Sequence, residues 1–231
     1  MEQEKSRKTF SDKAIKYFEN IRSPLLPESH GVDILNPYRD RSTLDCVRKF
    51  YSKFYSNSDE RIFSFGINPG RFGAGITGIN FTDPVALQEF CGIENSLDKR
   101  RELSSVFIYD FINSMGGPEE FFDKHYISAV SPLGFVKDGK NFNYYDNRDF
   151  MNDLTPFIVE SIRAQLEFGA RRDFAVIIGT GKNAKFMEEL NEKNGFFKKL
   201  VMVEHPRFIM QYRRKRMDEY LAKYVDIFSS G

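Results

Sequence analysis

The stretch "FSFGINPGRFGAGITGINFTDP", from Phe63 to Pro84, departs from ordinary secondary structure. An apolar run ends at Gly66, Asn68 opens an Asn-Pro-Gly turn, and three more glycines precede Phe81. Glycines directly after a strand indicate either a turn that needs a positive φ or a ligand that lies against bare backbone. The stretch therefore predicts a strand followed by a turn that another group approaches closely.

Short apolar runs that end in turn residues predict strands at 61–67, 126–133, 174–179 and 199–206. Helical patterns lie between them at 84–90, 104–115, 149–168 and 183–192, and before them at 11–21 and 42–55, the last with Ser42 as its N-cap. This alternation favours parallel crossovers. We expect an α/β fold in one domain, residues 1–231, with a central, mainly parallel four-stranded sheet and helices on both faces.

Composition and charge argue against several classes of protein. Two cysteines, Cys46 and Cys91, without a C-x-x-C pair or a His/Cys cluster, argue against a zinc site or a disulfide framework and fit a reducing cytoplasm. The start "MEQEKSRKTF" has no apolar signal segment, and no run approaches about eighteen apolar residues, so we expect no membrane partner. A net charge of +1 means that a nucleic-acid partner must be argued from local clusters.

Ligands of such a sheet gather at the carboxyl ends of its strands. The first predicted strand ends in "NPGRFGAGITG", the second in "SPLGF" and the fourth in "HPRF", whereas the third ends in "GTGKNA". Neither glycine-rich stretch has the spacing of a dinucleotide-binding or phosphate-binding loop. For "GTGKNA" alone, a tight connection from strand to helix remains the simpler interpretation.

Two of these strand ends together resemble motifs of the uracil-DNA glycosylase superfamily. The stretch 66–81 is similar to motif 1 of its single-strand-selective monofunctional branch, G-M-N-P-G-x-F-G-x-x-x-T-G-x-x-F, with Ile67 in place of Met. The second motif, a strand that ends in His-Pro, matches "VEHPRF" with His205 and Pro206. The resemblance suggests a divergent, bacterial-type member.

This resemblance implies roles for particular residues. Such an enzyme extrudes the nucleotide from the duplex into a pocket, where Phe81 would support the stacked base by about 1–3 kcal/mol. Asn68 would orient the water that attacks C1′, and His205 would donate a hydrogen bond to the departing uracil anion. Gly66, Ile67 and Gly70 would complete the substrate-binding residues. Phe81 as a core residue and His205 as a structural histidine are the plainer alternatives, and neither a metal nor a cofactor is implied.

One departure from the branch concerns the residue that would recognise the edge of the base. The branch has a pocket Asn where this sequence has Ala129, in "AVSPL". Ser131 lies on the same face of the predicted strand and is the nearest polar substitute, while Asn141 and Asn143 could reach in from the following loop. A rotating hydroxyl both donates and accepts hydrogen bonds. Hypoxanthine and xanthine are therefore expected as additional substrates.

DNA binding is expected from the segment "RFIMQYRRKR" at 207–216. In the family that this sequence resembles, the corresponding segment wedges into the duplex and places apolar side chains between base steps. The expected DNA-binding residues are Arg207, Phe208, Ile209, Met210, Arg213 and Arg214, with Lys182 as a phosphate contact. An amphipathic helix is the alternative, because Tyr212, Met217, Tyr220, Tyr224 and Ile227 share a face.

The resulting hypothesis is a monofunctional hydrolytic DNA glycosylase that removes uracil and begins base excision repair. Its partner would be single- or double-stranded DNA with deaminated bases, and we expect a cytoplasmic, nucleoid-associated monomer. A non-catalytic nucleic-acid or nucleotide-binding module on the same fold is the alternative. Asn68 and His205 together favour the enzyme, since binding alone needs neither.

Overall fold

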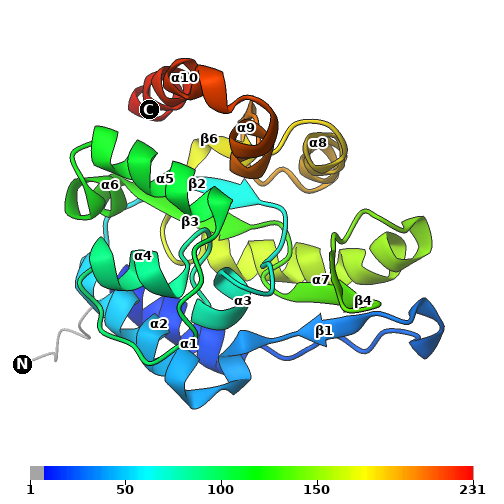
Figure 1. The fold of residues 1–231 in the computed structure, drawn as a ribbon. Helices are drawn as coiled ribbons and strands as arrows, with labels where there is room; N and C mark the ends of the chain where they lie inside the picture. Colours follow the sequence, from blue (N-terminus) through cyan, green and yellow to red (C-terminus); the bar gives the residue numbers. More distant parts are fainter. Residues whose placement is uncertain (1–7, 231) are drawn as a thin grey trace, which may run out of the picture.

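A parallel four-stranded sheet forms the centre of the molecule (Figure 1). The computed structural model describes residues 8–230, and its strand order is β3-β2-β6-β7. These strands are β2 (Arg61–Gly66), β3 (His125–Ala129), β6 (Ala170–Ile178) and β7 (Lys199–Val203). All four correspond to predicted strands and all pairs are parallel, so the expected α/β class is confirmed.

Helices cover both faces of this sheet. They are α1 (Phe10–Asn20), α2 (Arg41–Phe54), α3 (Ala74–Thr77), α4 (Pro84–Glu89), α5 (Leu103–Ser114), α6 (Pro118–Lys124), α7 (Arg148–Leu166), α8 (Lys182–Asn194), α9 (Pro206–Tyr212) and α10 (Met217–Ser229), with 3₁₀ turns at Glu28–His30, Pro37–Arg39 and Arg214–Arg216. The helix predicted from Ser42 begins at Arg41 instead. Asp40 is its N-cap, because the carboxylate Oδ1 accepts a 2.9 Å hydrogen bond from the Thr43 N–H.

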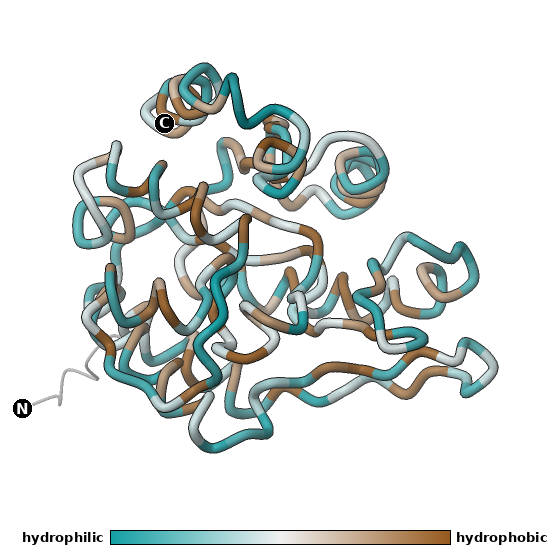
Figure 2. Tube along the Cα trace, in the orientation of Figure 1, coloured by the Kyte–Doolittle hydropathy of each residue, from teal (hydrophilic) through white to brown (hydrophobic). Residues whose placement is uncertain are grey.

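Neighbouring residues on β3 show how the two layers pack. The Tyr126 ring lies 5.2 Å from the Phe10 ring of α1, and its hydroxyl donates to Gln165 of α7. Adjacent His125 points to the other face and stacks on Phe121 of α6 with ring centroids 4.7 Å apart. Figure 2 shows apolar residues gathered toward the middle of the molecule and hydrophilic segments at its periphery. Side chains of β3 are therefore buried against helices on both faces of the sheet.

A second, antiparallel sheet was not predicted. It consists of β1 (Asp33–Leu35), β4 (Gly134–Lys137) and β5 (Lys140–Phe142) in the order β1-β4-β5. The β4–β5 turn is Asp138-Gly139, with φ of 48° and 68°, which matches the Asp-Gly turn of a two-residue hairpin. Gly134 lies so close to the first motif that a Cβ there would be 2.5 Å from the Pro69 carbonyl oxygen. The hairpin thus packs directly against the turn that follows β2.

His125 should make stability depend on pH. Burial lowers its pKa from 6.5 to about 4, and its Nδ1 has no hydrogen-bond partner in the described residues. The unfolded chain binds this proton as pH falls through 6.5, whereas the folded protein resists until about pH 4. The free energy of unfolding should therefore decrease by roughly 1–3 kcal/mol over that interval.

The measurement is urea unfolding of the wild-type protein and of His125→Phe at several pH values. The variant should lose less stability on acidification, since the other titrating groups are common to both proteins. Parallel curves for the two proteins would show that His125 does not carry this dependence.

Candidate active site

A cavity of about 340 Å³ opens at the carboxyl ends of the central strands. The turn after β2 forms one side of it, and the start of α9 forms another. Seven of the predicted site residues line this cavity: Gly66, Ile67, Asn68, Gly70, Phe81, His205 and Arg207. Ala129, Asn141 and Asn143, which the sequence placed near the base, line it as well. Residues more than 130 positions apart in the chain thus meet at one point, which is the arrangement expected of a parallel sheet.

Gly66 and Phe81 form the apolar floor of the cavity. A Cβ on Gly66 would lie 2.7 Å from Cε2 of the Phe81 ring, so only glycine permits this approach. Phe81 itself adopts a φ of 55°, a conformation that non-glycine residues rarely accept. Its half-buried ring lines the cavity and lies 5.5 Å from the His205 ring. The first glycine of the opening stretch is explained by this packing.

Asn68 is held by the last residue of β5 and by the segment that follows it. Its Nδ2 donates to the Phe142 carbonyl at 3.2 Å, and its Oδ1 accepts from the Tyr144 N–H at 3.1 Å. These two bonds fix which end of the amide carries the oxygen. Nδ2 also donates to the Pro69 carbonyl at 3.5 Å, and Oδ1 retains capacity for one more hydrogen bond. Asn68 is therefore oriented before any ligand arrives.

A buried hydrogen bond between Tyr144 and Asn183 fixes the position of the residue that binds Asn68. The Tyr144 hydroxyl donates to Oδ1 of Asn183 at 2.7 Å, and both side chains are buried. Asn183 belongs to "GTGKNA", where the sequence pointed only to Lys182 as a phosphate contact, and lies in the first turn of α8. Its role was missed because the hydrogen bond joins segments that no local pattern connects.

His205 is a neutral hydrogen-bond donor. It caps α9, where its Nδ1 accepts a 3.1 Å hydrogen bond from the Arg207 N–H, so the ring proton is on Nε2. Burial lowers the pKa of His205 to about 4, and the charge of Arg207 acts in the same direction. Gly179, directly after β6, packs beside the ring, since a Cβ there would lie 3.8 Å from its Cδ2. The imidazole is thus uncharged near neutral pH.

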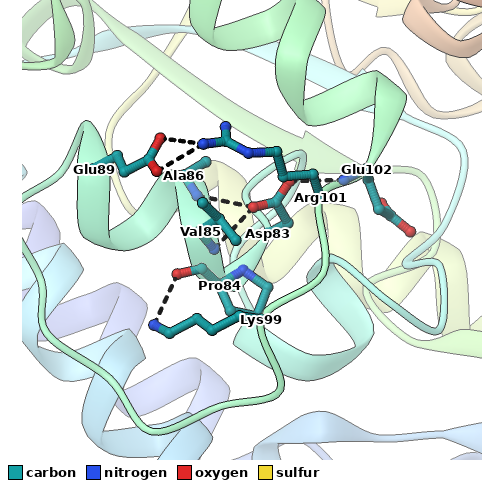
Figure 3. A network of polar contacts seen from close by, with 8 residues as sticks. All are labelled: Asp83, Pro84, Val85, Ala86, Glu89, Lys99, Arg101 and Glu102. Atoms are coloured by element: carbon teal, nitrogen blue, oxygen red, sulfur yellow. Dashed lines mark hydrogen bonds and ion pairs between the residues drawn. The ribbon is translucent and has the colours of Figure 1, made fainter.

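Further polar residues line the cavity without having been predicted: Asn80, Glu102 and Ser104. Asp83 positions Glu102, because its Oδ1 accepts from the N–H groups of Val85 and Ala86 while its Oδ2 accepts from the Glu102 N–H at 2.8 Å. Figure 3 shows this network, with the Glu102 carboxylate extending away from it. No motif marks Glu102, which a loop brings to the site.

Ser131 does not reach the cavity. β3 ends at Ala129, so the alternation that placed both residues on one face no longer applies at Ser131. The Ser131 hydroxyl is buried and donates to the Leu133 carbonyl at 2.9 Å. Ala129 does line the cavity, and the amides around it come from Asn80, Asn141 and Asn143.

The segment expected to contact DNA divides between core and surface. Ile209 and Met210 are 0% and 5% exposed, so their assignment to a DNA-contacting surface is wrong: this face of α9 packs against α5. Phe208 and Tyr212 are 40% and 67% exposed, with ring centroids 5.7 Å apart. The Arg213 guanidinium lies 5.3 Å from the Phe208 ring.

The remaining basic candidates lie at the surface. Arg207, Arg214 and Lys182 are exposed, and Lys182 Nζ lies 5.9 Å from the Tyr145 ring. Within residues 8–230, no group of three or more His, Cys, Asp or Glu side chains is arranged to hold a metal ion. None of the helices described for the chain is long and apolar enough to cross a membrane.

Two comparisons with known proteins found matches. The family model described as "Uracil DNA glycosylase superfamily" matches residues 53–229. A solved structure, described as the crystal structure of wild-type Pedobacter heparinus SMUG2, is similar with a TM-score of 0.92 and 42% sequence identity, over 97% of this chain and 98% of that chain. No curated protein matches this chain.

The contact between Gly66 and Phe81 should be measurable as an energetic coupling. Gly66→Ala should destabilise the protein by about 1–3 kcal/mol, because the added methyl group displaces the Phe81 ring. In a Phe81→Ala background the same substitution should cost less, giving an interaction free energy of at least about 0.5 kcal/mol. Urea unfolding of the four proteins provides the cycle, and strictly additive effects would contradict the contact.

Proposed function

We propose that this chain, which belongs to the uracil DNA glycosylase superfamily, hydrolyses the N-glycosidic bond of uracil in DNA and leaves an abasic site. It is a glycosylase-type DNA repair enzyme by its family and by its likeness to SMUG2. The observation that carries the specific proposal is the meeting of Asn68, Phe81 and a neutral His205 at one cavity. Binding alone would not require an oriented amide beside a neutral imidazole donor.

In this proposal the target nucleotide leaves the duplex and enters the cavity. The base stacks on the Phe81 ring, above the bare backbone of Gly66, and the deoxyribose lies toward Gly70. The available volume of about 340 Å³ is compatible with a single nucleoside. Phe81 supports the base through stacking, which is worth about 1–3 kcal/mol for a base on an aromatic ring.

Asn68 and His205 then act at different points of the reaction. The C1′–N1 bond breaks with its electron pair on uracil, and the sugar develops oxocarbenium character. The Nε2–H of His205 donates to the uracil O2, where negative charge grows only as the bond breaks. Asn68 uses its free hydrogen-bonding capacity to hold water in line with C1′.

At the position where the branch has its pocket Asn, this chain has Ala129, so the base edge would meet amides from other positions. Ala129 offers no hydrogen bond, whereas Asn80, Asn141 and Asn143 line the cavity. Amides both donate and accept, so they pair with uracil and with the oxo groups of deaminated purines. We propose hypoxanthine and xanthine as further substrates.

Duplex contacts are assigned to the surface of α9 and its surroundings. Arg207, Arg213, Arg214 and Lys182 would contact phosphates, while exposed Phe208 would enter the base stack. We propose that the chain works as a monomer and as a single domain.

The direct test is release of free base from single- and double-stranded oligonucleotides that contain uracil, hypoxanthine or xanthine, without added metal or cofactor. Strand breaks should appear only after alkaline treatment, as expected of a monofunctional enzyme. Breaks without alkali or amine would demand a lysine nucleophile and lyase chemistry. If no base is released from any substrate, the chain is instead a binding module.

Single-turnover rates separate the roles of Asn68 and His205. Asn68→Ala should lower the rate by about 10²- to 10⁴-fold with little change in DNA affinity. His205→Ala should lower it by roughly 10²- to 10³-fold on uracil, but by less on 5-fluorouracil, whose anion needs less help to leave. An equal loss on both bases would argue against leaving-group stabilisation by His205.

A further inference from the structure

Glu102 is the one carboxylate among the residues that line the cavity. Its Oε1 lies 3.3 Å from the position that a Cβ on Gly70 would occupy, and its Oε2 lies still closer to the corresponding position on Gly73. Both glycines belong to the turn after β2. The carboxylate therefore lies over bare backbone at the end of the cavity where the proposed reaction places the deoxyribose.

Folding does not explain this carboxylate. Glu102 stands at the N-cap of α5, yet its side chain forms no capping hydrogen bond, and it makes no ion pair among residues 8–230. Partly burying a carboxylate that has the Phe72 N–H but no ion pair beside it costs free energy. A negative charge beside DNA also opposes binding of the phosphates. A group that is unfavourable for both folding and binding calls for a chemical role.

The surroundings of Glu102 both raise and lower the pKa of its carboxyl group. Burial raises its pKa, and so does the neighbouring Asp83 carboxylate, whereas Arg207 and the Phe72 N–H lower it. Glu102 also lines an adjoining cleft whose basic residues are Arg71, Arg101, Lys140 and Arg207. Among these cations Arg207 favours the ionised form, and the raised pKa makes the ionised carboxylate a better proton acceptor.

We propose, on the basis of the proposed hydrolysis, that Glu102 is the general base that accepts a proton from the attacking water. The Asn68 amide orients that water but cannot take its proton. As the water oxygen bonds to C1′, one of its protons passes to the Glu102 carboxylate and the other remains on the new C1′ hydroxyl. The base has left with the electron pair of the C1′–N1 bond, and the proton on Glu102 returns to solvent or to the base as product departs. Before transfer, the same negative charge stabilises the oxocarbenium sugar.

The test compares Glu102→Gln with the wild-type protein under single-turnover conditions on single-stranded uracil DNA. Glutamine keeps the shape of the side chain but cannot accept the proton, so the rate should fall by about 10²-fold near neutral pH. The wild-type rate should also decrease as the pH is lowered through the acidic range in which the Glu102 carboxylate takes up a proton, and the variant should lack this decrease. His205 remains neutral above about pH 4, because its pKa is about 4.

Chemical rescue provides a readout that a structural role would not change. Added formate should restore part of the activity of Glu102→Ala, because a small carboxylate can occupy the vacated space, and should not restore Asn68→Ala. Glu160→Gln, on the exposed face of α7, is the matched control and should keep the wild-type rate and pH profile. Circular dichroism at each pH establishes that all variants are folded.

The outcomes are distinct. A Glu102→Gln rate within about threefold of wild type, or a pH profile of unchanged shape, would overturn the role of Glu102 while leaving the glycosylase proposal intact. Failure of the wild-type protein to release base would overturn both.

Discussion

The close approach of the Phe81 ring to the backbone of Gly66 is the contact on which the rest of the site depends. A methyl group at Gly66 would lie 2.7 Å from the ring, so the end of β2 can carry no side chain. The ring is also fixed by the backbone of Phe81, which takes a φ of 55°. A floor built in this way is rigid because both the sheet and the turn would have to move before the ring could.

The Asn68 side chain is positioned mainly by residues that do not themselves line the cavity. Asn68 is held by backbone groups of residues 142 and 144, and Tyr144 is held in turn by Asn183. The antiparallel hairpin β4–β5 supplies the segment that makes this possible and packs against Pro69. Orientation of a side chain before a ligand binds removes an entropic cost from each step that uses it. The small second sheet therefore serves the site as directly as the central one does.

Electrostatic differences divide the site into two regions. Burial keeps the His205 imidazole neutral with its proton on Nε2, which suits a donor to a developing anion. At the Gly70 and Gly73 end, Glu102 brings negative charge to a place where the proposed sugar becomes positive. Partial burial strengthens both interactions, because charges attract and repel more strongly where the dielectric constant is low.

The sequence by itself determined the four parallel strands, the α/β class, and the two motifs that carry Asn68, Phe81 and His205. Each depends on local order: apolar runs of strand length, glycines at strand ends, and a His-Pro pair after a strand. Only the tertiary structure decided that Ser131 turns away after β3 ends, that Ile209 and Met210 are core residues, and that Glu102, Asn80 and Asn183 belong to the site. Those placements depend on packing between segments distant in the chain, and such packing leaves no periodic pattern in the sequence.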